Sequence, residues 1–242
     1  MAAPAFRSSA NQQAVASSFT VTEPAGAASG DIFIGIAYIE ANTTFTTPTG
    51  WTDLFTASST ALDSGSMTTP DTWESKAFWI RRGGSAPSLT FTVGASAYGE
   101  ARVMAFSGAY SSGDPFSFVS KAVRNTSVLN SPFPDVSGTT DTADELLIWI
   151  GTNYTGATTW QKPTSPGTWT DRGTNFTDVY LADQSQAAAG ATGTVTGAAS
   201  NNGASSNAVS FLFGLRSLAA PGAYVAPTIV VPRYAPQRAA SW

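Results

Sequence analysis

The fold of this chain is decided by Gly30-Asp31-Ile32-Phe33-Ile34-Gly35-Ile36, an apolar run of strand length that an acidic residue introduces. After a polar loop the chain reaches Thr47-Pro48-Thr49-Gly50-Trp51-Thr52-Asp53, a turn sequence that ends in Trp-Thr-Asp. The same order returns later, from Asp144-Glu145-Leu146-Leu147-Ile148-Trp149-Ile150 to Ser165-Pro166-Gly167-Thr168-Trp169-Thr170-Asp171. The repeat predicts a β scaffold that is built from two related halves.

Strand signals surround the repeat on both sides. Ile32 to Tyr38 is almost continuously apolar, which predicts a central strand that is buried on both faces. Other short segments with alternating or β-branched residues are bounded by Gly, Pro or Ser, as strands usually are. Together these signals predict an all-β fold, an antiparallel β-sandwich.

The same patterns suggest how the chain is divided. Residues 1–16 are small and polar and predict an N-terminal extension, so the sandwich is expected at 17–216. Its halves would be 17–110 and 144–216, and the connector 111–143 would hold turns and one or two edge strands. Residues 217–242 contain prolines at short intervals, which forbid a helix and predict an extended, Pro-rich C-terminal arm.

Composition argues against several classes of function. The 242 residues include neither histidine nor cysteine, so a Ser-His-Asp or Cys-His device, the usual zinc ligands and disulfides cannot be built. The net charge is −4 and the only adjacent basic pair is Arg81-Arg82, which is not the footprint of a nucleic-acid binder. We therefore expect no enzyme activity, no cofactor, no metal and no nucleic-acid partner.

The sequence also bears on localisation. The N-terminus lacks a basic region followed by an apolar stretch, and the longest apolar runs are far shorter than the roughly 20 residues of a spanning helix. We expect a protein that is made in a cytosol and is not inserted into a membrane.

The acids of the repeat admit two interpretations. Asp53 and Asp171 each follow Trp-Thr, and a carboxylate glycosidase would need two such acids facing one another. The favoured interpretation is structural, because acids after a turn usually satisfy backbone groups at a strand start. A calcium site at Asp141, Asp144 and Glu145 is a weaker alternative, since that loop lacks the dense Asp-Gly pattern of a dedicated site.

The tryptophans raise the alternative of carbohydrate binding, because an exposed indole face stacks on sugar rings. Trp51 and Trp169 recur at equivalent turns, so packing is their expected role. The less constrained candidates for a sugar platform are Trp73, Trp79, Trp149 and Trp160. The expected structural motif comprises Asp31, Gly50, Trp51, Asp53, Glu145, Trp169 and Asp171, and the expected core comprises Ile34, Ile36, Trp51, Phe78, Phe91, Phe106, Ile148, Trp169, Leu181 and Phe211.

The first half has a distinctive order of motifs: Pro24-Ala25-Gly26, Gly30-Asp31, Pro48-Thr49-Gly50-Trp51-Thr52, Phe78-Trp79 and Ala105-Phe106-Ser107-Gly108, with a weaker echo in 144–216. This order resembles a loosely defined group of virion proteins of tailed bacteriophages. The resemblance implies a jelly-roll-like scaffold, a minor tail or capsid-decoration protein that works by oligomerising and docking. It carries over no catalytic residues, and it leaves the position on the capsid or tail open.

The C-terminal arm is the expected docking element. Residues 1–216 hold ten basic and sixteen acidic residues, whereas 217–242 hold two arginines and no acid, so a positive arm extends from an acidic body. Its expected anchors are Tyr224, Ile229, Val230, Val231, Arg233, Tyr234, Arg238 and Trp242. We expect a virion structural protein that binds other virion proteins and forms a homo-oligomer; the alternative is a carbohydrate-binding module that recognises host-surface glycans.

Overall fold

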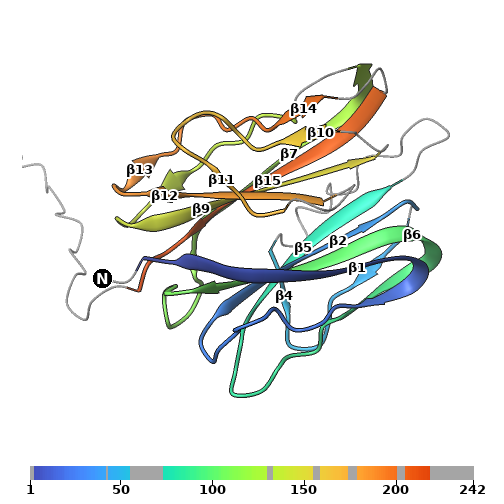
Figure 1. Cartoon of the computed structure of the whole chain (residues 1–242), viewed down its shortest axis with the longest axis horizontal. Helices are drawn as coiled ribbons and strands as arrows, with labels where there is room; N and C mark the ends of the chain where they lie inside the picture. The colour runs from blue at the N-terminus through green and yellow to red at the C-terminus, as the bar shows by residue number, and fades with distance from the viewer. Residues whose placement is uncertain are drawn as a thin grey trace, which may run out of the picture.

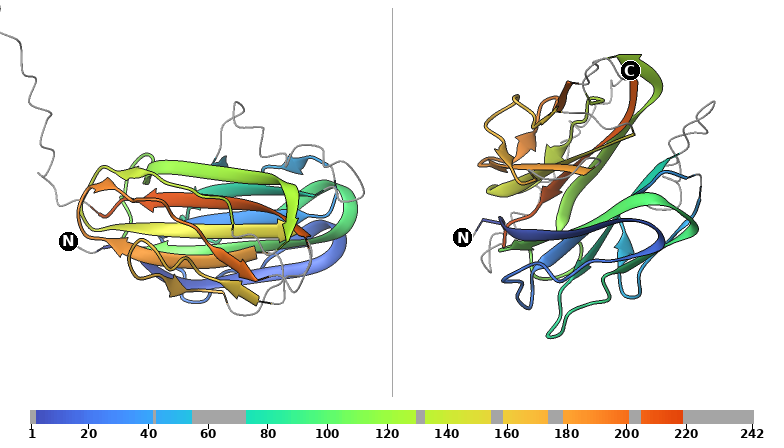
Figure 2. Two further views of the ribbon diagram at one scale, coloured as in Figure 1. Left: turned by 90° about the horizontal axis from the view of Figure 1, so that it is seen from above. Right: turned by 45° about the vertical axis from the view of Figure 1, so that its right-hand side comes forward.

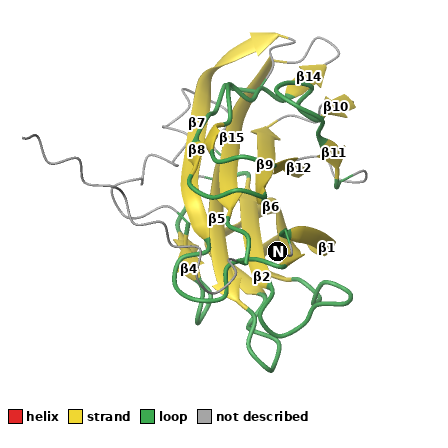
Figure 3. Ribbon diagram, turned by 90° about the vertical axis from the view of Figure 1, so that its left-hand side faces the viewer, coloured by secondary structure: helices red, strands yellow, loops and turns green. Residues whose placement is uncertain are grey.

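The computed structural model describes residues 3–41, 43–54, 73–129, 133–154, 159–173, 179–200 and 205–218. This part of the chain is built from antiparallel strands, turns and loops (Figures 1 and 3). It contains no helix that could cross a membrane. The prediction of an all-β antiparallel fold is confirmed.

The first sheet is formed by the N-terminal part of the chain. Its strands are β1 (Ala5–Thr20), β2 (Ile32–Ile39), β3 (Phe45–Thr46), β4 (Thr52–Asp53), β5 (Glu74–Arg81) and β6 (Thr90–Ser107). They lie in the order β1-β6-β2-β5-β4, and β3 pairs with β6 off this path.

The second sheet is formed by the C-terminal part. Its strands are β7 (Phe116–Leu129), β9 (Glu145–Tyr154), β11 (Thr170–Asp171), β12 (Val179–Gln186) and β15 (Ser205–Leu215). They lie in the order β11-β12-β9-β15-β7. Two short ribbons accompany this sheet: β8 (Thr139–Thr140) with β13 (Gly190–Ala191), and β10 (Thr159–Gln161) with β14 (Ala198–Ser200).

The two sheets have the same strand order when the chain is followed through each. The strands β1, β6, β2, β5 and β4 correspond in place to β7, β15, β9, β12 and β11. The register corresponds as well: Asp53 lies across β5 from Gly35, and Asp171 lies across β12 from Trp149. Gly35 and Trp149 are each the fourth residue after the acid at the start of the central strand. The repeated sequence thus marks equivalent positions in two sheets.

Two details of the expected organisation are corrected. Residues 5–16, expected as part of an extension, belong to β1 and pair with β6. Small polar residues suffice there, because an edge strand has a neighbouring strand on one side only. Each half of the described chain also stays in its own sheet, which differs from the jelly-roll-like connectivity that the resemblance implied. Within the connector 111–143, β7 is an edge strand of the second sheet and β8 pairs with β13.

The main core lies between the two sheets, which form separate layers (Figure 2). Side chains from β2, β5 and β6 meet side chains from β7, β9, β12 and β15 there. Phe116 of β7 packs edge-on against Trp79 of β5, with ring centroids 5.7 Å apart. This face-to-face packing defines a β-sandwich.

Each sheet also buries its outer face. On the first sheet, Phe19, Trp51 and Phe91 cover the central strand, and on the second sheet Phe133 and Trp169 do so. All eight residues of β2 are buried as a result, as the continuous apolar sequence predicted. The described structure therefore has three apolar clusters, one between the sheets and one outside each.

The predicted core is confirmed at all ten positions. Trp51 is 6% exposed, Trp169 is 1% exposed, and the other eight side chains are fully buried.

Replacing Phe211 with Ala should lower the free energy of unfolding by about 3–5 kcal/mol, because the side chain is fully buried between the sheets. Urea denaturation measures this change. Val119→Ala is the control, since Val119 is exposed on β7, and it should change stability by less than about 0.5 kcal/mol. Equal effects of the two substitutions would contradict the assignment of the core.

Candidate functional site

The acids that open the two central strands hold the preceding loops in place. Asp31 is 4% exposed, accepts a hydrogen bond from the backbone N–H of Ala28 at 2.8 Å, and pairs with the Arg7 Nε at 2.7 Å. Glu145 is 1% exposed, and its Oε1 accepts from the backbone N–H groups of Asp141 and Thr142 at 3.1 and 2.8 Å. Both acids are therefore structural loop anchors.

The partner of each acid comes from an equivalent irregularity in the neighbouring edge strand. β1 shifts register at Arg7, and β7 shifts register at Ser117, whose hydroxyl donates to the Glu145 Oε2. A bulge re-aims the side chain of the extra residue, which here points it at the buried acid. No local sequence pattern marks Arg7 or Ser117, because a bulge is a property of strand pairing.

Asp53 and Asp171 each bind residues of their own sheet. Asp53 pairs with the Lys76 Nζ at 2.8 Å and accepts a hydrogen bond from the Thr47 hydroxyl at 2.6 Å. Asp171 accepts a hydrogen bond from the Tyr180 hydroxyl at 2.8 Å, and Tyr180 occupies the place in β12 that Lys76 occupies in β5. Burial, and then the hydrogen bond to Asp171, raise the pKa of Tyr180.

These contacts separate the two aspartates. Asp53 belongs to β4 in the first sheet and Asp171 to β11 in the second. The carboxylate oxygens of each accept hydrogen bonds from residues close in sequence or on the adjacent strand. The pair does not form the two-carboxylate arrangement that a glycosidase needs.

The Pro-Gly turns position the two repeated tryptophans. Gly50 has φ +84°, and the Trp51 backbone N–H donates to the Pro48 carbonyl at 3.0 Å, which closes a turn that requires glycine at its third position. The Trp51 indole N–H donates to the Ser88 carbonyl at 2.7 Å, and that of Trp169 donates to the Pro166 carbonyl at 3.0 Å. Both rings are thereby fixed over the outer face of their own sheet.

The sheet surface below the two tryptophans differs between the halves. A Cβ added at Gly35 would lie 2.9 Å from the Phe91 ring and 3.0 Å from the Trp51 ring, so this position must stay small. The equivalent residue of the second sheet is Trp149, which stands beside Ala182 in the outer cluster. The two sheets thus have the same strand order, but different side chains pack at this equivalent position.

The other tryptophans with described side chains are also packed. Trp73 and Trp149 are at most 1% exposed, and Trp79 is half-buried against Phe116. The side chain of Trp160 lies outside the described residues. A flat sugar platform needs an exposed indole face, so these three tryptophans do not provide one.

A buried arginine that sequence reasoning missed connects the sheets. Arg102 of β6 is 1% exposed, and its guanidinium donates to the Val179 carbonyl of β12 at 3.2 Å and to the Ser9 hydroxyl of β1 at 3.4 Å. Burial lowers the pKa of Arg102, and the negative charges of Glu100 and Asp171 oppose this shift. The sequence pattern that could have identified Arg102 is its position as a charged residue inside the apolar run that ends at Phe106.

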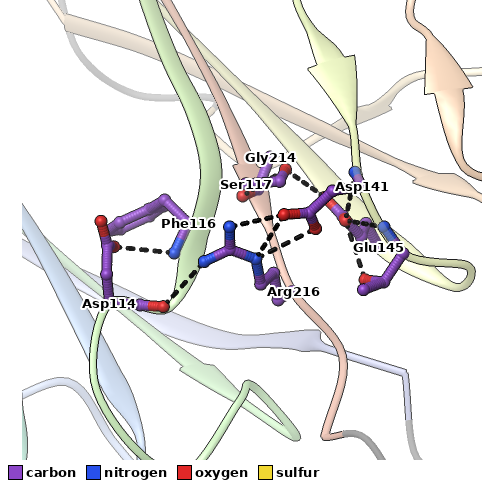
Figure 4. Close-up of polar contacts among 8 residues, drawn as sticks. Asp114, Phe116, Ser117, Asp141, Glu145, Gly214 and Arg216 are labelled. Atoms are coloured by element: carbon purple, nitrogen blue, oxygen red, sulfur yellow. Dashed lines mark hydrogen bonds and ion pairs between the residues drawn. The ribbon is translucent and has the colours of Figure 1, made fainter. Parts of the chain in front are cut away.

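A second missed arginine, Arg216, lies just after β15, close to the end of the described chain (Figure 4). The Arg216 guanidinium binds both carboxylate oxygens of Asp141, with nitrogen–oxygen distances of 2.6 to 3.0 Å, and donates to the Asp114 carbonyl at 3.0 Å. The hydrogen bonds from Arg216 hold the pKa of Asp141 below its ordinary value. Because Arg216 occupies Asp141 and backbone groups occupy Glu145, the expected alternative of a calcium site loses two of its three acids; the described residues contain no cluster suited to a metal.

The last described residues, Ser217 and Leu218, are tied to the loop that follows β6. Ala109 and Ser217 form an isolated bridge, and the Leu218 backbone N–H donates to the Gly108 carbonyl at 2.9 Å. Gly108 lies against Ala3, since an added Cβ would be 2.6 Å from the Ala3 carbonyl oxygen. Leu218, the last described residue, is 40% exposed. The predicted anchors from Tyr224 to Trp242 lie outside the described residues.

Comparison with known proteins returns no match: no family model, curated protein or solved structure is similar to this chain.

The double substitution Trp51→Ala with Trp169→Ala should lower the free energy of unfolding by the sum of the single effects, within about 0.5 kcal/mol. Each single change should cost about 3–5 kcal/mol, because each ring fills a separate apolar cluster. Chemical denaturation of the four variants measures the coupling. A coupling above about 1 kcal/mol would show that the two rings share one site.

Asp141→Asn should destabilise the protein at neutral pH by about 0.5–1 kcal/mol, because it weakens the ion pair with the partly exposed Arg216. The pKa of Asp141 is lowered by folding, so its contribution is present above about pH 4 and is lost as the pH falls through the lowered value. The stability gap to wild type should therefore close in acid, as denaturation at several pH values will measure. Asp144→Asn is the matched control, because Asp144 is exposed with φ +58°, a conformation that Asn tolerates.

Proposed function

We propose that this protein is a non-enzymatic structural component of a bacteriophage virion, of the minor tail or capsid-decoration type. Its β-sandwich body is the exposed module, and the C-terminal arm docks it on neighbouring subunits. The observation that carries the proposal is the braced junction at Arg216 to Leu218, from which the basic and aromatic segment 219–242 departs.

The charge distribution supports a docking role for the arm. The body up to residue 216 carries a net charge of −6, and the segment beyond it carries Arg233 and Arg238 without any acid. Arginine and aromatic residues are the side chains that most often dominate binding energy in protein interfaces. A segment of this composition is suited to an acidic groove on another subunit.

The contacts of the body support an architectural role for the repeated motif. Asp31, Asp53, Glu145 and Asp171 each bind loop or strand residues, and the two repeated tryptophans are packed in outer clusters. The burial of Trp73 and Trp149 weakens the support for the alternative of glycan recognition.

Removing residues 221–242 should leave a folded body that no longer joins particles, because the arm supplies the docking contacts. Thermal unfolding checks the fold, and quantification of the protein in purified particles checks incorporation. A sharper pair of variants keeps the arm: Arg233→Glu with Arg238→Glu should abolish incorporation, whereas Arg233→Lys with Arg238→Lys should retain most of it. Normal incorporation of the truncated chain would overturn the docking role.

A further inference from the structure

β1 is the long edge strand of the first sheet. Its residues from Ala5 to Ala16 pair continuously with β6, except for the bulge at Arg7. Between Ala16 and Ser18 the strand bends, and the Thr20 backbone N–H returns to the Gln12 side chain. The side of β1 that faces away from β6 is the end of the strand order, with no further strand among the described residues.

This edge lacks the usual protection against pairing with another chain. Natural edge strands are commonly short, or carry lysine, proline or inward-pointing charges. From Ala5 to Ala16 the strand has no proline and no lysine, and its only charge, Arg7, is near one end and is engaged by Asp31. Val15, near the other end, is 72% exposed, the most exposed large apolar side chain in the described structure.

The second sheet provides an internal comparison. β7 holds the equivalent edge position, but it carries Lys121 and Arg124 near its middle. Charged residues on an edge strand, lysine above all, disfavour pairing with another chain, so β7 carries a protection that the middle of β1 lacks.

We propose that β1 is a homodimerisation edge, at which the β1 strands of two copies pair antiparallel and join their first sheets across a twofold axis. Opposed residues of an antiparallel pair share one face of the sheet, so the twofold axis passes beside a single residue. In a register centred on Asn11, Ala10 lies opposite Gln12 and Val15 lies opposite the bulge at Arg7. No like charges meet in that register. Antiparallel pairing of one strand with its own copy is self-complementary, as a closed dimer requires.

Sedimentation equilibrium of the full chain tests the proposal. Wild type should show a reversible dimer at concentrations up to about 100 µM. Val15→Lys should raise the dissociation constant at least tenfold, because it places a lysine on each side of the axis, close to Arg7 of the other copy. Val119→Lys, at an exposed position of β7, is the matched control and should leave the constant unchanged within about twofold.

Cross-linking gives a second, independent measurement. Because the chain has no cysteine, a single Asn11→Cys substitution places one thiol per copy at the proposed axis. Oxidation with copper phenanthroline should convert this variant to a covalent dimer, since directly opposed strand residues fall within disulfide reach. Val119→Cys should form no covalent dimer under the same treatment.

The outcomes separate this proposal from the docking role of the arm. A monomeric wild type, or a dimer that Val15→Lys leaves intact, overturns the β1 interface. A dimer that dissociates on Arg233→Glu with Arg238→Glu, but not on Val15→Lys, assigns self-association to the arm and also overturns it. Loss of the dimer on Val15→Lys with normal thermal unfolding, together with covalent dimers of Asn11→Cys and none of Val119→Cys, supports it.

Discussion

Two central strands with apolar side chains on both faces set the plan of this molecule. A strand such as β2, in which every residue is buried, cannot be covered by one opposing sheet alone. Each sheet therefore needs the other sheet on one face and its own loops and turns on the other. The tryptophan turns, the loop around Phe133 and the ribbons of the second half all belong to that outer covering.

The acids of the repeat accept hydrogen bonds from backbone groups that this burial removes from water. A loop that enters a fully buried strand brings backbone N–H groups that need acceptors, and Asp31 and Glu145 supply them at the first turn of each half. The buried carboxylates in turn need donors, which come from bulged residues of the edge strands. Equivalent acids and equivalent bulges in both halves show that the strand start and the edge strand form one unit.

The arrangement also bears on function. The acids and tryptophans of the repeat bind and pack within the body. The features proposed for assembly lie at the margins of the described structure: the outer edge of β1, and Leu218, after which the sequence is basic. Both are features through which one protein meets another, in line with the proposed role in assembly.

Much of the scaffold could be predicted from the sequence, since strand periodicity, turn residues and the repeated motif are local signals. They identified the central strands and the packing of Trp51 and Trp169 at equivalent turns. They did not show that Trp73 and Trp149, the candidates for a sugar platform, are buried. They missed β1 between Ala5 and Ala16, because an edge strand of small polar residues has no apolar pattern to distinguish it from a loop. They also missed Arg102 and Arg216, whose partners are distant in sequence.

By itself, then, the sequence determined the β class and the ten predicted core residues, because burial leaves an apolar pattern in neighbouring residues. Only the tertiary structure decided that each half stays within one sheet, that Asp53 and Asp171 do not face one another, and which edge is left open. Those outcomes depend on strand pairing and bulges between segments up to a hundred residues apart, for which no local pattern exists.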